Sequence, residues 1–179
     1  MKSCNTTTTG FPDGPVPPAA DPQAGASVEF FETPGDPSTL LVATLPTSPD
    51  PLIFAPTVPI SSFAGASGVM SGPDNSLFTY LGSGRLLYTG PIGLFLIQGG
   101  VTVEATDAAA LDIVIKDVAL PRTGTATLGD GSTVVLVAGA VRSLKFGDVI
   151  ELGMFNLGVA PNLVAIVSLE MTVIAVGRP

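Results

Sequence analysis

Two stretches of this sequence decide its fold, and each joins a tight turn to an apolar segment of strand length. The first is Leu86-Leu-Tyr-Thr-Gly90-Pro-Ile-Gly-Leu-Phe-Leu-Ile-Gln98, in which a Gly-Pro turn leads into an apolar strand. The second is Leu144-Lys-Phe-Gly-Asp148-Val-Ile-Glu-Leu152, in which a Gly-Asp corner starts another strand. Both stretches predict extended structure around sharp turns.

The surrounding sequence is also rich in strand signals. Two apolar runs flank Gly82-Ser-Gly84, so a hairpin is predicted over residues 77–89. Residues 94–104 continue as a strand across Gly99-Gly100, where we expect a bulge or a bend. Further strands are predicted for residues 111–116, 132–141 and 149–155.

The longest strand signal lies near the C-terminus, over residues 163–176. Apolar and polar residues alternate there with period two, which is typical of a half-buried strand. The apolar set is Val167, Leu169, Met171 and Val173, and the polar set is Ser168, Glu170 and Thr172. With no convincing helical window, the chain is predicted to be all-β, an antiparallel sandwich or barrel.

The order and spacing of these motifs resemble the jelly-roll head shared by complement globular heads, tumour-necrosis-factor-like cytokines and many viral surface proteins. The resemblance covers roughly residues 75–176. It rests on the turn at Gly84–Gly90, the strand Leu94–Ile97, the Gly-Asp corner at 144–149 and the final strands. It implies a jelly-roll sandwich that forms a homotrimer around a three-fold axis. The chain has no tryptophan and no collagen-like Gly-x-y stalk, which favours the viral, bacteriophage branch of structural proteins.

Proline content predicts how the chain divides. Of the 17 prolines, 12 lie in the first 59 residues. Because each proline removes a backbone donor and favours extended geometry, we predict an extended Pro-rich N-terminal arm over residues 1–50 and the jelly-roll head over residues 51–179. The arm also contains apolar side chains that need a surface to cover them, so we predict that they bind a partner shell. These residues are Phe30, Phe31, Leu40, Leu41 and Val42.

Charge excludes some partners. The chain has 179 residues, a net charge of −8 and only 12% charged residues, with no Lys or Arg between Ser3 and Gly84. Nucleic-acid binding needs a basic footprint, and acidic membranes repel an anionic surface, so neither partner is expected. So few charges on a monomer would leave apolar patches in water, which favours an oligomer.

The cysteine content and the polarity of the first residues indicate the cellular compartment in which the protein is made. Cys4 is the only cysteine, so the chain cannot form an internal disulfide, in keeping with synthesis in a host cytoplasm. The first residues are too short and polar for the apolar part of a signal peptide. No run of 18 apolar residues is present, so no transmembrane helix is expected.

Residues suited to catalysis are scarce. The chain has no histidine, and Cys4 has no base beside it, so we predict no catalytic residue, no cofactor and no enzyme activity. The strongest metal candidate is a group of aspartates in or beside loops that could bind calcium, although turn aspartates are common for backbone reasons alone. They are Asp107, Asp112, Asp117 and Asp130, and we predict that they hold no metal.

The function predicted first is that of a virion structural protein, most concretely a capsid decoration or cement protein. Its trimeric head would sit on the capsid surface, and its arm would staple neighbouring major capsid subunits. The alternative is a receptor-binding or spike head of a virus or phage that recognises a host surface glycan. A secreted complement-like or cytokine-like ligand comes third, because no signal peptide is expected.

Overall fold

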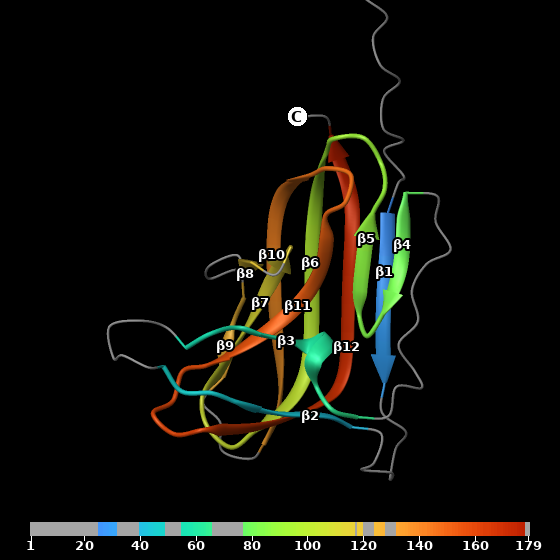
Figure 1. The fold of residues 1–179 in the computed structure, drawn as a ribbon. Helices are drawn as coiled ribbons and strands as arrows, with labels where there is room; N and C mark the ends of the chain where they lie inside the picture. Colours follow the sequence, from blue (N-terminus) through green and yellow to red (C-terminus); the bar gives the residue numbers. More distant parts are fainter. Residues whose placement is uncertain are drawn as a thin grey trace, which may run out of the picture.

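The computed structural model describes residues 25–31, 40–48, 55–65, 77–116, 118–119, 124–127 and 132–177. These residues form two antiparallel sheets packed face to face in a jelly-roll sandwich (Figure 1), which confirms the predicted fold class. Among the described residues no helix is long and apolar enough to span a membrane.

The first sheet, sheet A, is built on three long strands. Its order is β1 (Gly25–Phe31), β12 (Asn162–Gly177), β6 (Gly93–Ala105) and β10 (Thr133–Leu144). A fifth strand, β2 (Leu41–Leu45), pairs with β12 along the same edge as β1, opposite residues 162–166. The N-terminal strands β1 and β2 therefore pair with successive parts of β12 along one edge of sheet A.

The second sheet, sheet B, has seven strands, most of them short. Its order is β4 (Phe78–Gly82), β5 (Arg85–Tyr88), β11 (Val149–Asn156), β7 (Ala109–Ile115) and β8 (Val118–Ala119). Strand β3 (Val58–Pro59) pairs with β11, and β9 (Ala126–Thr127) pairs with β7; a short 3-10 helix, η2 (Ile60–Ser62), follows β3. Gly124 and Thr125 join β10 to β7 through backbone hydrogen bonds, so the two sheets are connected along this side.

Alternate residues of the two sheets meet in one apolar core. Strand β6 alternates between buried and more exposed positions along its whole length. At one end of the core Phe78, Tyr88 and Phe95 form an aromatic trio with ring centroids 4.9–5.9 Å apart. The Tyr88 hydroxyl donates to the Pro91 carbonyl at 2.6 Å, and burial raises the pKa of this phenol above its ordinary value.

The predicted hairpin over residues 77–89 is present. Strands β4 and β5 pair across a turn in which Gly82, Ser83 and Gly84 all have positive φ. The Gly-Asp corner is also where the sequence places it, and Gly147 adopts a φ of 87° that favours glycine.

Of the bulge or bend predicted at Gly99-Gly100, the bulge is wrong. Strand β6 keeps an unbroken register with β10 through both glycines. Gly99 has a packing role instead, because a Cβ there would collide with the Leu152 side chain of sheet B. The pairing of β6 with β12 is irregular at two other places, between Ile166 and Ser168 and between Ala175 and Gly177. At the first, Val167 leaves the buried face on which the sequence pattern placed it, and Ile166 is buried.

The predicted boundary between arm and head at residue 50 is corrected by the sheet pairing. Strands β1 and β2 lie within the predicted arm, yet both pair with β12 in the head. Their short apolar runs are docked on the chain's own sheet, an option that proline density alone could not distinguish from docking on a neighbour. Residues 1–24, the most Pro-rich part of the predicted arm, lie outside the described residues.

Candidate assembly surface

The outer face of sheet A, called here the sheet A face, is the surface on which exposed apolar side chains gather. Most inward-facing residues of β12, β6 and β10 are buried, whereas their neighbours point away from the core. The large apolar side chains exposed on this face are Phe31, Val135, Val137, Val141, Leu163, Ile174 and Val176. Seven large exposed apolar side chains on one sheet face make this face the candidate interaction surface of the described residues.

Strand register shows which side chains of the sheet A face are neighbours. One row across the sheet contains Phe31, Ser168, Thr102 and Val135, and the Ser168 hydroxyl donates to Thr102 Oγ1 at 2.8 Å. The next row contains Glu29, Glu170, Gly100 and Val137. In these two rows the apolar side chains lie on the edge strands β1 and β10, and polar ones lie on the inner strands β12 and β6 and, at Glu29, on β1.

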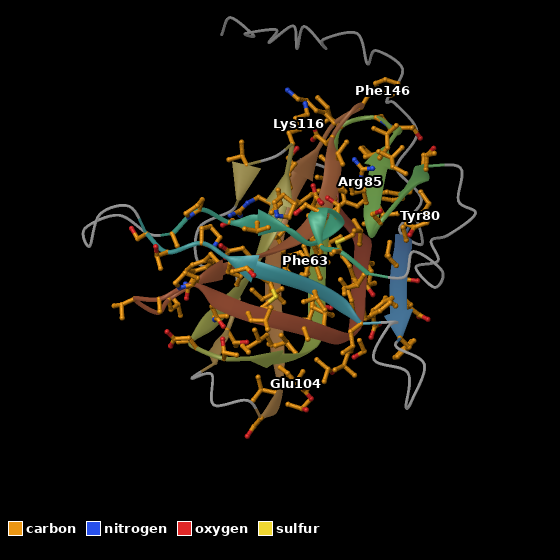
Figure 2. The ribbon with its side chains drawn as sticks, turned by 60° about the horizontal axis from the view of Figure 1, so that its bottom comes forward. Phe63, Tyr80, Arg85, Glu104, Lys116 and Phe146 are labelled. Carbon is orange, nitrogen blue, oxygen red and sulfur yellow. The ribbon has the colours of Figure 1, made fainter. Side chains whose placement is uncertain are left out.

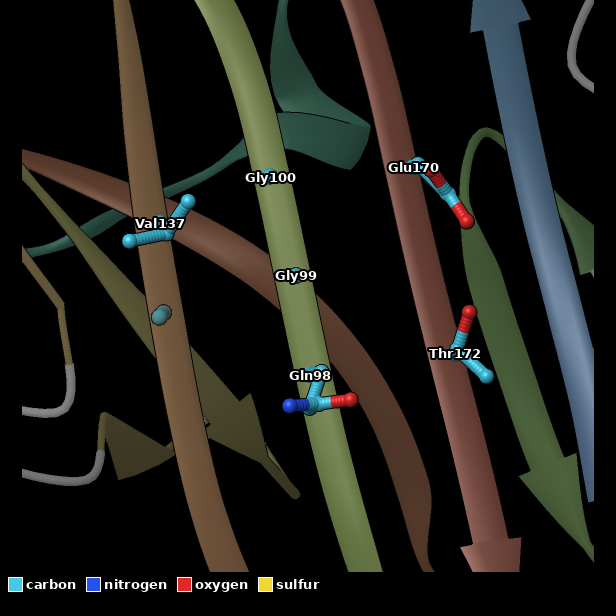
Figure 3. Close-up of a pocket in the computed structure, with 7 residues that line it drawn as sticks. Gln98, Gly99, Gly100, Val137, Glu170 and Thr172 are labelled. Atoms are coloured by element: carbon cyan, nitrogen blue, oxygen red, sulfur yellow. The ribbon is translucent and has the colours of Figure 1, made fainter.

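Gly100 leaves a hollow in this face. The hollow has a volume of about 290 Å³, and Figure 3 shows the bare backbone of Gly99 and Gly100 between Val137 of β10 and Glu170 of β12. Gln98 and Thr172 lie on its polar side. A second hollow of about 160 Å³ lies between Phe31 and Val135.

The protomer itself does not require glycine at position 100. A Cβ added to Gly100 would meet only the Leu136 carbonyl oxygen, at 3.8 Å, whereas the adjacent Gly99 is packed against Leu152. Gly139 on β10 is similarly open, since a Cβ there would meet only the Ile97 carbonyl oxygen at 3.9 Å. Glycine within a strand weakens the strand, so an open glycine is typical of a place where another chain approaches closely.

The charge of the sheet A face is acidic. Its described ionisable side chains are Glu29, Glu104 and Glu170, and Glu104 accepts a hydrogen bond from Thr133 at 3.0 Å. The described bases lie elsewhere, in sheet B, at the loop end of the sandwich or on β10 positions that alternate away from this face. They are Arg85, Lys116, Arg142 and Lys145.

The structure separates the five predicted partner-binding residues. Phe30 and Leu41 are buried in the core of this protomer, at 1% and 5% exposure, so they cannot also contact a partner in this fold. Phe31 is 58% exposed on the sheet A face, whereas Leu40 and Val42 are half-buried. Alternation along β1 explains the split, because adjacent Phe30 and Phe31 point to opposite faces.

The loop end of the sandwich is organised by Asp148, which confirms its predicted role at the corner. Its Oδ2 accepts a hydrogen bond from the Lys145 amide at 2.9 Å, and its Oδ1 lies 2.7 Å from Lys116 Nζ. The ion pair to Lys116 was not evident from the sequence, because 31 intervening residues separate the two. Phe146 is 73% exposed in this corner, and Figure 2 shows it at the same end of the molecule as Lys116.

The candidate calcium ligands do not converge in the described part of the chain. Asp107 accepts a hydrogen bond from the Ala108 amide in the turn after β6, and Asp112 is buried in β7. Asp117, Asp130 and Cys4 lie outside the described residues. Among the residues described, no three acidic, histidine or cysteine side chains are grouped so that they could hold a metal ion.

Three solved structures have the same arrangement of strands. The globular domain of zebrafish complement 1qA protein matches with a TM-score of 0.51 and 14% identity, over 87% of this chain and 98% of that chain. Eiger TNF from S. frugiperda matches with a TM-score of 0.55 and 11% identity, over 89% and 96%. The PRD1 vertex protein matches with a TM-score of 0.51 and 13% identity, over 88% and 100%.

These likenesses confirm the resemblance noted in the sequence. The chain has the jelly-roll fold of complement- and TNF-like heads, and a viral protein is among the structures that share it. At such low identity the likeness defines the fold and leaves function to be argued from the surface. No protein-family model and no curated protein sequence matches the chain.

Proposed function

We propose that this chain is a structural protein of a virus particle, and that it assembles as a homotrimer through the sheet A face. The observation that carries the proposal is the exposed apolar set on that face, from Phe31 to Val176. Such a set is favourable only when another surface covers it, and burial of each valine- or phenylalanine-sized side chain is worth about 1.5–3 kcal/mol.

Two further observations support this class of function. The fold is shared with the PRD1 phage vertex protein, which is a protein of a virus particle. The described residues contain no histidine and no group of side chains suited to a metal ion, and the solved structures that share the fold are structural or signalling proteins. The absence of enzyme activity stays a prediction.

The finer proposal is a capsid decoration or cement role, with the trimer on the capsid surface in contact with the major capsid protein. Attachment by an N-terminal arm is now proposed for residues 1–24, because residues 25–31 and 41–45 are strands of the head. Phe31 remains a candidate contact, whereas Phe30 and Leu41 do not.

Light scattering of the purified full-length chain tests the trimer. We expect a stable trimer at micromolar concentration, and a stable monomer there would contradict the proposal. Cryo-electron microscopy of particles carrying the protein tests the decoration role, which requires many copies at three-fold or quasi-three-fold positions on the shell.

A receptor-binding or spike head that recognises a host glycan is the second candidate. The observation that favours it is the exposed Phe146 at the loop end, with the exposed Ile92 in the neighbouring loop. Aromatic and apolar side chains on loops suit stacking on sugars. Phe146→Ala would abolish glycan binding under this candidate and would leave shell attachment unchanged under the first.

A further inference from the structure

The corner between β10 and β11 presents a phenylalanine to solvent on a turn that hydrogen bonds hold in place. In this corner turn, Lys145-Phe146-Gly147-Asp148, the Asp148 amide donates to the Lys145 carbonyl at 3.0 Å, and the Lys145 amide donates to Asp148 Oδ2 at 2.9 Å. Gly147 has a φ of 87°, which suits the third position of a type II turn. Phe146 occupies the second position and is 73% exposed. Turn geometry does not require an aromatic side chain there, so the Phe146 ring is available to a ligand.

Both sheets support the corner turn. The Gly147 amide donates to the Tyr88 carbonyl of sheet B at 2.9 Å. In sheet A, Gly93 and Leu144 are register partners, so Ile92 and Lys145 are the next residues beyond the same end of the β6–β10 pair. Ile92 is exposed and adds a second apolar side chain to this end of the sandwich.

Positive charge gathers at the same end of the sandwich. Three of the four described bases lie there, namely Lys116, Arg142 and Lys145, whereas the acidic Glu104 lies at the opposite end (Figure 2). Asp148, the acid of the corner turn, is matched by Lys116, so Arg142 and Lys145 have no ion-pair partner in the described part of the chain. Although the whole chain has a net charge of −8, this end of its described surface attracts anions.

The hydrogen bonding of the corner turn favours recognition through side chains. The backbone amides of Lys145, Gly147 and Asp148 are all bonded within the chain, so they cannot pair with an added peptide strand. An exposed aromatic ring beside a cation suits a sugar that carries an acidic group. The ring can cover the apolar face of the sugar, and the cation can donate to its carboxylate or sulfate.

Resting on the second candidate function, a glycan-binding head, we propose that the corner turn binds acidic glycans. Phe146 stacks on a sugar ring, Lys145 pairs with the anionic group of that sugar, and Arg142 attracts the next anionic group along the glycan. Arg142 lies three residues before Lys145 on β10, about 10 Å away at the roughly 3.3 Å rise of a strand.

Calorimetric titration of the full-length chain with monovalent oligosaccharides tests the proposal. The probes are a galacturonic acid tetramer, which carries carboxylates, a heparin tetrasaccharide, which carries sulfates, and the uncharged maltotetraose. We expect an acidic probe to bind at least about tenfold more tightly than maltotetraose at low salt. This preference should shrink at about 1 M salt, where charges are screened within about 3 Å. Tight binding of either acidic probe supports the proposal, and the tighter of the two identifies the anionic group.

Matched variants locate the site on the corner turn. Phe146→Ala should weaken binding of the acidic probe at least about tenfold. Val159→Ala, which shortens an exposed apolar side chain in the loop between β11 and β12 at the opposite end, should leave binding unchanged. Lys145→Gln should weaken binding and reduce its salt dependence, whereas Arg85→Gln, beside the β4–β5 turn, should do neither. Far-UV circular dichroism checks that each variant is folded.

The remaining outcomes separate this proposal from the function on which it rests. Equal affinity for maltotetraose and the acidic probes would overturn the acidic class and leave a glycan-binding head in place. Equal weakening by Lys145→Gln and Arg85→Gln would assign the effect to net charge and overturn the site. A wild-type chain that binds no saccharide, or that binds a glutamate-rich peptide instead, would overturn both this proposal and the second candidate function.

Discussion

The outer faces of the two sheets differ in what covers them. In sheet B the outward residues of β7 and β11 are buried, among them Ala110, Asp112, Val114, Glu151 and Phe155. In sheet A the outward residues of β10 and β12 include valines, a leucine and an isoleucine that remain exposed. Sheet B therefore uses both faces within the chain, whereas the outer face of sheet A keeps these apolar side chains exposed in the described part of the chain.

Under the proposed assembly, this difference separates stability from association within one chain. We expect a substitution on an inward position or on sheet B to change the stability of the fold, and a substitution on the sheet A face to change association. Adjacent residues can belong to different classes because side chains alternate along a strand. Substitutions at two adjacent residues on opposite faces of a strand therefore distinguish stability from association most clearly.

The largest effect is expected from deletion of residues 1–50. The deletion removes β1 and β2, and among their buried side chains are four large ones, namely Val28, Phe30, Leu41 and Leu45. At about 1.5–3 kcal/mol each, their loss is comparable with the whole stability of a typical domain, about 5–15 kcal/mol. We expect the truncated chain to show no cooperative thermal unfolding by circular dichroism. Deletion of residues 1–24 should leave the transition in place, and an intact head after the longer deletion would refute the pairing described here.

The next largest effect is expected from Val137→Asp on the assembly. This change removes an apolar contact worth about 1.5–3 kcal/mol and adds a carboxylate to an acidic surface. The trimer should dissociate at micromolar concentration in light scattering, while circular dichroism stays that of the folded protomer. Val118→Asp in β8 is the control, since Val118 is as exposed but lies outside the sheet A face. Dissociation by both variants would argue against an assembly surface on sheet A.

Gly99→Val and Gly100→Val test the comparison at two adjacent residues. A valine at position 99 overlaps the Leu152 side chain and should lower the free energy of unfolding by about 1–3 kcal/mol. A valine at position 100 meets open space, so protomer stability should be unchanged or up to about 1 kcal/mol higher, and the trimer should weaken. Urea unfolding measures the first effect and light scattering the second. Equal destabilisation by both would show that Gly100 also serves the protomer.

The smallest effect is expected from Tyr88→Phe. The loss of the hydrogen bond to the Pro91 carbonyl should lower the unfolding free energy by about 0.5–1.5 kcal/mol at neutral pH. Burial raises the pKa of the Tyr88 phenol, so its contribution is present below the unfolded value of about 10 and is lost as pH rises above it. The fall in melting temperature between about pH 7 and about pH 10.5 should therefore be smaller in the variant than in the wild-type protein. A steeper alkaline loss in the variant would contradict this assignment.

Local patterns in the sequence were sufficient to predict the strands and turns that depend on nearby residues. The hairpin around Gly82-Ser-Gly84 and the corner at Gly147-Asp148 follow from turn chemistry alone. The alternation of Leu169, Met171 and Val173 gave the buried face of β12. These elements depend on side-chain order over a few residues, which the sequence states directly.

Features that depend on distant partners were not accessible in this way. The register shift at Val167, the packing of Gly99 on Leu152 and the ion pair from Asp148 to Lys116 each need residues far apart in the chain. The docking of β1 and β2 was missed for the same reason, because a short apolar run does not indicate which surface will cover it. The acidic pair of Glu29 and Glu170 becomes visible only through their register.

The aromatic trio has a consequence for spectroscopy. The chain has no tryptophan and two tyrosines, and both tyrosines, Tyr80 and Tyr88, belong to the β4–β5 hairpin. All tyrosine fluorescence of the protein therefore originates from one edge of sheet B, with Tyr88 in ring contact with Phe78 and Phe95. Intrinsic emission can follow the opening of that edge without any engineered label, and an interface on sheet A leaves the signal largely undisturbed.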